Sequence, residues 1–310
     1  MFSGQGSQYY HMGKDLYIQN AGFRRWMCIL DNMVYQNVGI SVVNEIYNEK
    51  KTSADQFNDT FYTHLAIFMV EYALARVLIE NGLEPDCLLG ASLGEFTSAA
   101  VSGVLTVEET LECLLKQAEL LKCYCKPGGM IAVIDNVELY KQISIISQQI
   151  ELAAINYSSH FVISGDSEQL SKVINFLKTK NTFFQILPVM YGFHSSNIDS
   201  IQNKYTEFLN KISFKKSSIP VLSCFLGGRV TEFSSNQFWN VIRQPIHFEK
   251  TILTMEAYYQ FNYIDVGPAG TLLNFVKKNL KTESLSKFYD ILTPYQKDSL
   301  KLKKLRDSLY

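Results

Sequence analysis

The chain has 310 residues, which is enough for one large domain or for a large domain that carries a smaller insert. Hydrophobic residues make up 47% of the sequence and charged residues 19%, as in a globular protein with a sizeable core. The formal net charge is −1, so no basic field points to nucleic acid or to an anionic membrane as a partner.

The expected compartment follows from sorting signals and cysteine usage. We find no apolar run of the ~20 residues that a membrane span needs, and the opening residues MFSG enter glycine-rich sequence instead of a signal peptide. The six cysteines form no C-x-x-C pair, and Cys123 with Cys125 lacks the second pair of a zinc site. We therefore expect a cytoplasmic protein with reduced thiols and no metal, with a redox role for Cys123 and Cys125 as an alternative.

The first motif in the chain is a glycine-rich loop, GQGSQ, at residues 4–8. Such a loop normally follows a strand, yet only two residues precede Ser3, so the strand is either very short or absent from this sequence. The glycines let the backbone approach a ligand and bring Gln5 within reach of an anion. A flexible terminus is the alternative interpretation.

Helices are predicted over most of residues 13–79. In residues 13–48, apolar side chains such as Phe23, Met27 and Leu30 recur at helical spacing. Residues 63–79 form a strongly apolar helix that faces a core. His64, at its start, is expected to be a structural histidine rather than a catalytic group.

Residues 90–95, GASLGE, have the G-x-S-x-G form of a nucleophile elbow. A short apolar run at residues 83–89 is typical of a buried strand, and residues 96–105 are typical of a helix. In such a unit Ser92 sits on a strained turn with its hydroxyl exposed, and the two flanking glycines let the turn close. Because the G-x-S-x-G pattern is common, its interpretation as a nucleophile elbow needs support from other motifs in the chain.

The character of the sequence changes after the next helix. That helix opens with a Thr106–Glu109 capping box and stops at the KPGG of residues 126–129. From residue 127 to residue 190 the predicted elements follow the order β-α-β-β-α-β, which is a ferredoxin-like unit. We therefore predict an α/β protein in which residues 1–126 and 191–310 form the large domain and residues 127–190 form a small inserted subdomain.

The second part of the large domain carries a histidine on a turn. YGFHSS at residues 191–196 contains His194, and a helix is predicted over residues 198–212. Residues 220–224 are expected to return to the main sheet as a strand, and residues 244–248 form a turn between two helices. A further strand begins at residue 263 and enters the Gly-Pro turn of DVGP, after which residues 272–280 form a last amphipathic helix.

Five motifs, taken together and in this order, resemble one family. They are the GQGSQ loop, the elbow ending in LGE, GFHS at residues 192–195, Gln244-Pro245 ahead of an aromatic residue, and DVGP at residues 265–268. The set is similar to the acyltransferase family that includes malonyl-CoA:acyl-carrier-protein transacylases and the acyltransferases of polyketide synthases. The resemblance covers nearly the whole chain. It implies an α/β-hydrolase-like large domain with an inserted ferredoxin-like subdomain.

The resemblance also implies a role for each matching residue. Ser92 would be the nucleophile that forms an acyl-enzyme ester. His194, an imidazole titrating near neutrality, would be its general base and then its general acid. The backbone carbonyl of Gln244 would orient this histidine in place of a carboxylate. The other implied site residues are the oxyanion-hole amides of Gln5 and Leu93, and Ala91, Asn156 and Phe193 around the substrate.

Two departures from the family pattern bear on specificity. The family usually has histidine before the nucleophile, where this chain has Ala91. Transacylases also carry an arginine on the second helix after the elbow, which grips the free carboxylate of malonyl groups through two parallel hydrogen bonds. Aligned back from Gly129-Met130, that position is Gln117, and the nearest cation, Lys116, points about 100° around the helix. A neutral glutamine predicts discrimination against malonyl by a factor of roughly hundreds or more.

With serine and histidine intact but no carboxylate clamp, the chain resembles the stand-alone acyl hydrolases of trans-acyltransferase polyketide systems. Those enzymes clear stalled or aberrant acyl groups, such as acetyl, from the phosphopantetheine arms of carrier proteins. The resemblance implies the same reaction here, with an acyl carrier protein as partner and with no cofactor. We expect a monomer.

Three alternatives stay open. A transacylase that loads malonyl or other acyl units onto carrier proteins would use the same catalytic residues. A docking module without catalysis would have no need of Ser92 and His194. A generic esterase would normally place Asp or Glu between its serine and its histidine, and no candidate stands out there.

Overall fold

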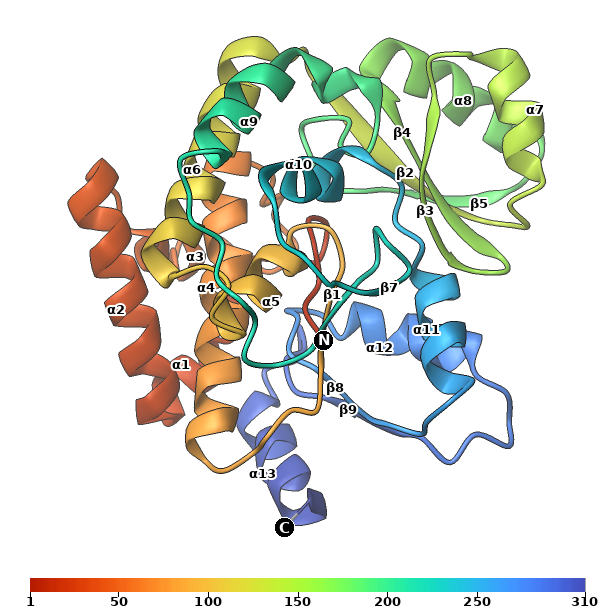
Figure 1. Ribbon diagram of the computed structural model, residues 1–310. Coiled ribbons are helices and arrows are strands. Elements are labelled where there is room, and N and C mark those ends of the chain that lie inside the picture. Colours follow the sequence, from red (N-terminus) through yellow and green to blue (C-terminus); the bar gives the residue numbers. More distant parts are fainter. Residues whose placement is uncertain (310) are drawn as a thin grey trace.

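The computed structural model describes residues 1–309 and shows a mixed α/β fold with a large domain and a small ferredoxin-like subdomain (Figure 1). Helices from the first eighty residues lie on one side of the short parallel strands, and the antiparallel sheet lies at the upper right of Figure 1. The N-terminal helices are α1 (Lys14–Gln19), α2 (Ala21–Val38), α3 (Val42–Ile46) and α4 (Thr60–Glu80).

The large domain is built on short strands. β1 (Leu88–Gly90) pairs in parallel with β6 (Val221–Ser223), and β7 (Gly228–Arg229) adds antiparallel to β6. β8 (Asn262–Asp265) pairs in parallel with β9 (Lys287–Asp290). The prediction that residues 220–224 return to the main sheet is therefore confirmed.

Met1 and Phe2 join these two groups of strands. The Phe2 N–H donates to Leu89 O at 2.8 Å, which extends the pairing of β1. On the other side, the Met1 amino group donates to Ile264 O at 2.7 Å, and the Val266 N–H donates to Met1 O at 3.2 Å. Residues 1 and 2 therefore occupy the strand position ahead of the glycine-rich loop, between β1 and β8.

Helix α4 runs through the large domain as a core helix. All its side chains from Thr63 to Ala75 are buried. Its 21 residues are long and apolar enough to cross a membrane by length and composition, so the expectation that no such run exists is wrong. However, 83% of its most apolar window is buried inside the protein, which is the position of a core helix of a globular fold.

The segment that interrupts the large domain forms its own four-stranded antiparallel sheet. Its elements are β2 (Gly128–Ile134), α7 (Leu139–Ile146), β3 (Glu151–Tyr157), β4 (His160–Asp166), α8 (Ser167–Thr179) and β5 (Phe183–Ile186). The strand order is β3-β4-β2-β5, and buried residues such as Ile131, Phe161 and Val173 form a separate core. This is the ferredoxin-like subdomain, and the boundaries at residues 127 and 190 stay a prediction.

The remaining helices belong to the large domain. They are α5 (Gly94–Val101), α6 (Val107–Tyr124), the 3₁₀ helix η1 (Ser196–Ile201), α9 (Gln202–Leu209), α10 (Ser235–Arg243), α11 (Phe248–Glu256), α12 (Thr271–Asn279) and α13 (Asp298–Leu309). The Thr106–Glu109 capping box is present at the start of α6. The helix predicted over residues 198–212 is divided into η1, which the Ser195 side chain caps by accepting from the Asn197 N–H, and α9, which ends at Leu209.

Candidate active site

Ser92 lies on the turn between β1 and α5 in a strained backbone conformation. Its φ is +56°, in the left-handed region that costs a non-glycine residue about 1–2 kcal/mol. A Cβ at Gly94 would stand 2.1 Å from Phe2 O, and one at Gly90 would stand 2.6 Å from the Glu95 backbone. Both glycines are therefore needed for strand, turn and helix to pack this closely, as in a nucleophile elbow.

Ser92, His194 and Gln244 form a hydrogen-bonded chain. Ser92 Oγ lies 2.8 Å from His194 Nε2, and His194 Nδ1 lies 2.7 Å from Gln244 O. A carbonyl oxygen only accepts, so Nδ1 carries the hydrogen and Nε2 is the acceptor for the Ser92 hydroxyl. This is the tautomer that a general base for the serine requires. The orienting group is a backbone carbonyl, at the position where the resemblance puts it.

His194 is itself held in an unusual environment. Its φ is +58°, its N–H donates to Ile242 O at 3.0 Å, and the residue is only 2% exposed. The pKa of His194 is lowered to about 4, chiefly by burial; the bond to Gln244 opposes this shift, and the positive charge of Arg243 adds a smaller lowering effect. The imidazole is therefore neutral at pH 7 and ready to accept a proton. The expectation that it titrates near neutrality is corrected by its burial.

The glycine-rich loop packs directly on the elbow. A Cβ at Gly4 would stand 2.9 Å from Ala91 O and from the Ser92 Cβ, and 3.4 Å from Leu93 N. Leu93 caps the start of α5, where the first amides of a helix have no acceptor within it. The Gln5 side chain donates to Thr63 Oγ1 at 3.0 Å. Residue 4 of the loop thus packs against the segment that carries Ser92 and Leu93, and the oxyanion-hole role of the Gln5 and Leu93 amides stays a prediction.

A buried carboxyl group that the sequence analysis missed supports this loop. Glu71 of α4 accepts from the Ser3 N–H at 2.6 Å and from Ser3 Oγ at 2.8 Å, and its other oxygen accepts from Thr97 Oγ1 on α5. Burial raises the pKa of Glu71 to about 8, against the lowering effect of these hydrogen bonds. An acidic residue on an otherwise apolar helix face is the signal that would have found it.

A second buried carboxyl group lies three residues after the serine. Glu95 is 4% exposed and accepts from the Phe225 N–H at 3.2 Å, beyond the end of β6. Burial raises its pKa to about 8 as well. Glu71 and Glu95 thus tie α5 to the strands and loops around it.

Gln117 lies on the buried face of α6. Its side chain is 1% exposed, and its Oε1 has no hydrogen-bond partner among residues 1–309. Neighbouring Lys116 points outward and pairs with Glu119 at 3.0 Å, so it brings no charge to the buried face. An unpartnered buried acceptor costs about 1–3 kcal/mol, so its presence here calls for a functional explanation.

Contacts across α4 connect this face of α6 with the histidine turn. His64, whose Nδ1 has no hydrogen-bond partner within residues 1–309, lies near the backbone of Leu114, one helical turn before Gln117. The ring of His64 lies 5.7 Å from the ring of Phe193, which precedes His194 and is buried. Burial lowers the pKa of His64 to about 3, so it is a neutral packing residue. His64 thus lies between Leu114 of α6 and Phe193 of the histidine turn, and the place of Gln117 in the acyl-binding site stays a prediction.

Asn156 and Ala91 make contacts that do not involve the Ser92 and His194 side chains. Asn156 Nδ2 lies 3.1 Å from His160 Nδ1, and its backbone oxygen accepts from Asn279 Nδ2 at 2.7 Å. Within residues 1–309 its hydrogen bonds are not to Ser92 or His194, so any role for it in the site stays a prediction. Ala91 is buried at 5% exposure in an apolar cluster of the large domain, where a methyl group fits.

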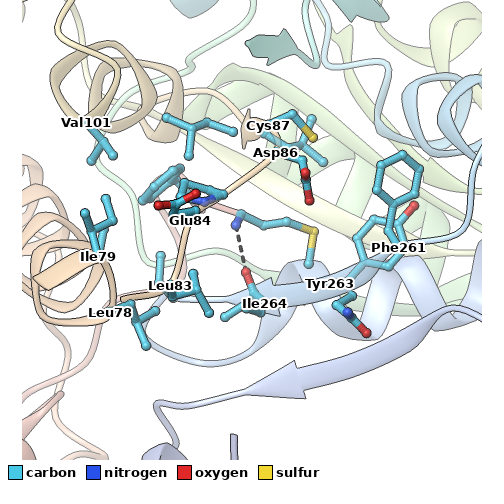
Figure 2. Close-up of a pocket in the computed structure, with 18 of the residues that line it drawn as sticks. Leu78, Ile79, Leu83, Glu84, Asp86, Cys87, Val101, Phe261, Tyr263 and Ile264 are labelled. Atoms are coloured by element: carbon cyan, nitrogen blue, oxygen red, sulfur yellow. Dashed lines mark hydrogen bonds between the residues drawn. The ribbon is translucent and has the colours of Figure 1, made fainter. Parts of the chain in front are cut away.

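A cavity of about 370 Å³ lies at the opposite end of β1 from the serine (Figure 2). Its walls come mainly from residues 82–89 and 260–264, and they include Met1, whose amino group donates to Ile264 O. Neither Ser92 nor His194 lines it. The cavity is therefore distinct from the serine–histidine site, which sits beyond the carboxyl end of the strand.

Comparison with known proteins places the chain among acyltransferases. A family model described as acyl transferase domain matches residues 1–309. A polyketide biosynthesis acyltransferase homolog, PksD of Bacillus subtilis, is 43% identical over 96% of this chain and 92% of its own length. A second, BaeD of Bacillus velezensis, is 41% identical over 100% of this chain and 95% of its own length.

Solved structures share the fold. A loading acyltransferase from the avermectin modular polyketide synthase superposes with a TM-score of 0.89 at 22% identity, over 98% of each chain. The protein MCAT from Streptococcus pneumoniae superposes with a TM-score of 0.79 at 26% identity, over 97% of this chain and 98% of its own. By the match along its whole described length and by these relatives, the chain belongs to the acyl transferase domain family.

Proposed function

We propose that the protein is an acyl hydrolase that removes stalled or aberrant acyl groups, such as acetyl, from acyl-carrier-protein thioesters in polyketide biosynthesis. The observation that carries the proposal is the Ser92–His194–Gln244 chain accompanied by a buried, uncharged Gln117. The two Bacillus relatives, whose names assign them to polyketide biosynthesis, support the setting and the carrier protein as partner.

In the first half-reaction Ser92 Oγ attacks the thioester carbonyl carbon while His194 Nε2 takes the hydroxyl proton. The carbonyl oxygen becomes an oxyanion, which the backbone amides of Gln5 and Leu93 would stabilise; one such donor contributes about 2.7–4 kcal/mol in comparable enzymes. The carbon–sulfur bond then breaks, and the phosphopantetheine thiol leaves with the proton from His194. An acyl-serine ester remains.

In the second half-reaction water replaces the serine as nucleophile. His194 takes a proton from water, and the new oxygen–carbon bond forms as the Ser92 ester bond breaks. Ser92 recovers its proton from His194, and the free carboxylic acid leaves. The cycle closes with water and protein groups alone, so the proposal includes no cofactor.

The choice of acyl group is assigned to Gln117. A malonyl group carries a carboxylate, and burying that carboxylate requires a cation beside it. Helix α6 brings no lysine to its buried face at this point, because Lys116 points outward and pairs with Glu119. The amide of Gln117 donates hydrogen bonds but has no charge, and its Oε1 would repel a carboxylate oxygen. Uncharged chains such as acetyl and butyryl meet neither penalty, so we assign them as the substrates.

The test uses carrier protein loaded with acetyl, butyryl or malonyl groups, followed by intact mass of both proteins. The proposal predicts that acetyl and butyryl carriers return to the free thiol while malonyl carrier persists, and that Ser92→Ala stops the reaction. Equal hydrolysis of all three would overturn the specificity. Full activity of Ser92→Ala would overturn the mechanism.

A transacylase that loads malonyl or other acyl units in trans is the second candidate. It is favoured by the relatives, whose names describe acyltransferase homologs. Adding a second, unloaded carrier protein to the same assay separates the two functions. Acyl transfer to that carrier faster than release to water would identify a transacylase.

A further inference from the structure

Arg243 makes a three-way ion-pair cluster next to the histidine. Its Nη1 lies 3.1 Å from Glu151 Oε2, and its Nε lies 2.5 Å from Asp199 Oδ1. The Arg243 side chain is 17% exposed, so the cluster is half-buried rather than freely solvated. The three residues come from the end of α10, from β3 of the ferredoxin-like subdomain, and from η1.

Two members of the cluster, Arg243 and Glu151, are attached to parts of the catalytic chain. Arg243 immediately precedes Gln244, whose carbonyl accepts from His194. The second oxygen of Glu151 accepts from the Ser196 N–H at 2.6 Å, two residues after the histidine. Glu151 therefore holds the histidine turn with one oxygen and the Gln244 segment with the other.

Backbone pairing adds a second connection between the same segments. Beyond Gln244, the Ile155 N–H donates to Ile246 O at 3.0 Å, and the Ile246 N–H donates to Ala153 O at 2.8 Å. The chain between α10 and α11 thus runs beside β3 (Figure 1). The Gln244 carbonyl lies between two anchor points, Arg243 and Ile246, and both are bound to β3.

We propose that Glu151, Arg243 and Asp199 are positioning residues that hold the His194 ring and the Gln244 carbonyl in line with Ser92. Because Glu151 belongs to the ferredoxin-like subdomain, the alignment of His194 also depends on the position of that subdomain. The inference rests on the proposed function only in requiring Ser92 to act as a nucleophile. A misplacement of about 1 Å in such a site costs about 100-fold in rate.

An exposed ion pair of the subdomain provides a contrast. Lys172 and Glu168 lie one turn apart on α8, with side chains 49% and 78% exposed, and they connect no separate segments. Exposed pairs of this kind contribute little to stability. Glu168→Gln is therefore a matched control for Glu151→Gln, because it removes the same charge from the same subdomain.

The experiment compares Glu151→Gln, Arg243→Lys and Glu168→Gln with the unaltered protein, each checked by thermal unfolding. Glu151→Gln keeps an acceptor for the Ser196 N–H but loses the charge. Arg243→Lys keeps the charge but loses the planar guanidinium that donates to Glu151 and Asp199 at the same time. The first readout is the rate at which a fluorophosphonate probe labels Ser92. In that reaction an oxygen–phosphorus bond forms, fluoride leaves, and His194 takes the hydroxyl proton.

We expect labelling to slow about 10- to 100-fold in Glu151→Gln and Arg243→Lys, and to change less than about twofold in Glu168→Gln. With a small acetyl thioester, kcat should fall by the same factor while KM stays unchanged. Unfolded protein would lower the apparent kcat in the same way, so thermal unfolding is used to establish that each variant is fully folded. Labelling at the unaltered rate in folded Glu151→Gln would overturn the proposal, even if Arg243→Lys fails to fold.

This result is separable from that of the proposed function. The probe reports on Ser92 and His194 whatever the natural acyl group is. If the unaltered protein is labelled but does not hydrolyse acetyl carrier protein, the proposed function fails, and the comparison of variants still decides the role of the cluster. If the unaltered protein is not labelled, both proposals fail.

Discussion

Ser92 and His194 face each other at hydrogen-bond distance, but they are held in place by different kinds of contact. Both have left-handed backbones, with φ of +56° and +58°. The serine turn is fixed by close backbone packing, with glycines against residue 2 and buried Glu71 behind the loop. The histidine turn is fixed by a carbonyl and by charged side chains that reach into another subdomain. The nucleophile is thus held by backbone packing of its turn against residues 2–4, whereas its base is held by side-chain and carbonyl contacts from other segments.

Removing the nucleophile is the largest change available on the serine side. Ser92→Ala should abolish the acyl-enzyme and lower kcat about 10⁶-fold, as the loss of a serine nucleophile does elsewhere. The measurement is intact mass after mixing with an acetyl thioester, followed by turnover. A residual mass shift of one acetyl group in the variant would mean that another residue is the acceptor.

Next comes the backbone packing that presents the serine. Gly94→Ala would bring a Cβ to 2.1 Å from Phe2 O, and this backbone neighbour cannot rotate away. We expect the free energy of unfolding in urea to fall by about 3 kcal/mol or more. Gly228→Ala is the control, because a Cβ there meets nothing within 4 Å. Equal stability of the two variants would show that the backbone around Gly94 leaves room for a Cβ.

A smaller effect is expected from restoring a cation on α6. Gln117→Arg should raise the ratio of malonyl to acetyl turnover roughly 30- to 100-fold, because a guanidinium can pair with the malonyl carboxylate. Lys116→Arg is the control, since that side chain points outward toward Glu119. Competition between malonyl and acetyl thioesters gives the ratio directly. An unchanged ratio in Gln117→Arg would mean that residue 117 does not face the acyl group.

What the sequence predicted well lies in contiguous motifs. The elbow has glycines at fixed offsets from Ser92, and the same glycines make the turn sterically possible, so pattern and geometry coincide. The ferredoxin-like order of elements could also be predicted, because its strands and helices follow one another along the chain. His194 was found because its turn carries a recognisable GFHS.

What the sequence did not predict depends on contacts between distant residues. Nothing near Glu151 indicates that it would meet Arg243, which lies 92 positions later. Glu71 looked like part of an apolar helix, and its partner Ser3 lies 68 positions away. The low pKa of His194 follows from burial, which no local pattern reports. Positions set by tertiary packing were missed for this common reason.

The smallest predicted effect concerns pH and tests the histidine side directly. His194 must be neutral to take the serine proton, and its pKa is lowered from 6.5 to about 4 by burial. Activity on a small acetyl thioester should therefore stay level from pH 8 down to about 5 and fall only as pH approaches 4.

Arg243→Met should move this fall toward higher pH. The substitution removes a positive charge that lowers the pKa of His194 and leaves the nearby carboxylates of Glu151 and Asp199 unneutralised, so the imidazolium is favoured. Activity against pH for this variant and for Glu168→Gln gives the comparison. A fall centred near pH 6.5 in the unaltered protein would show that the ring is solvated, and the histidine turn would then be far looser than the serine turn.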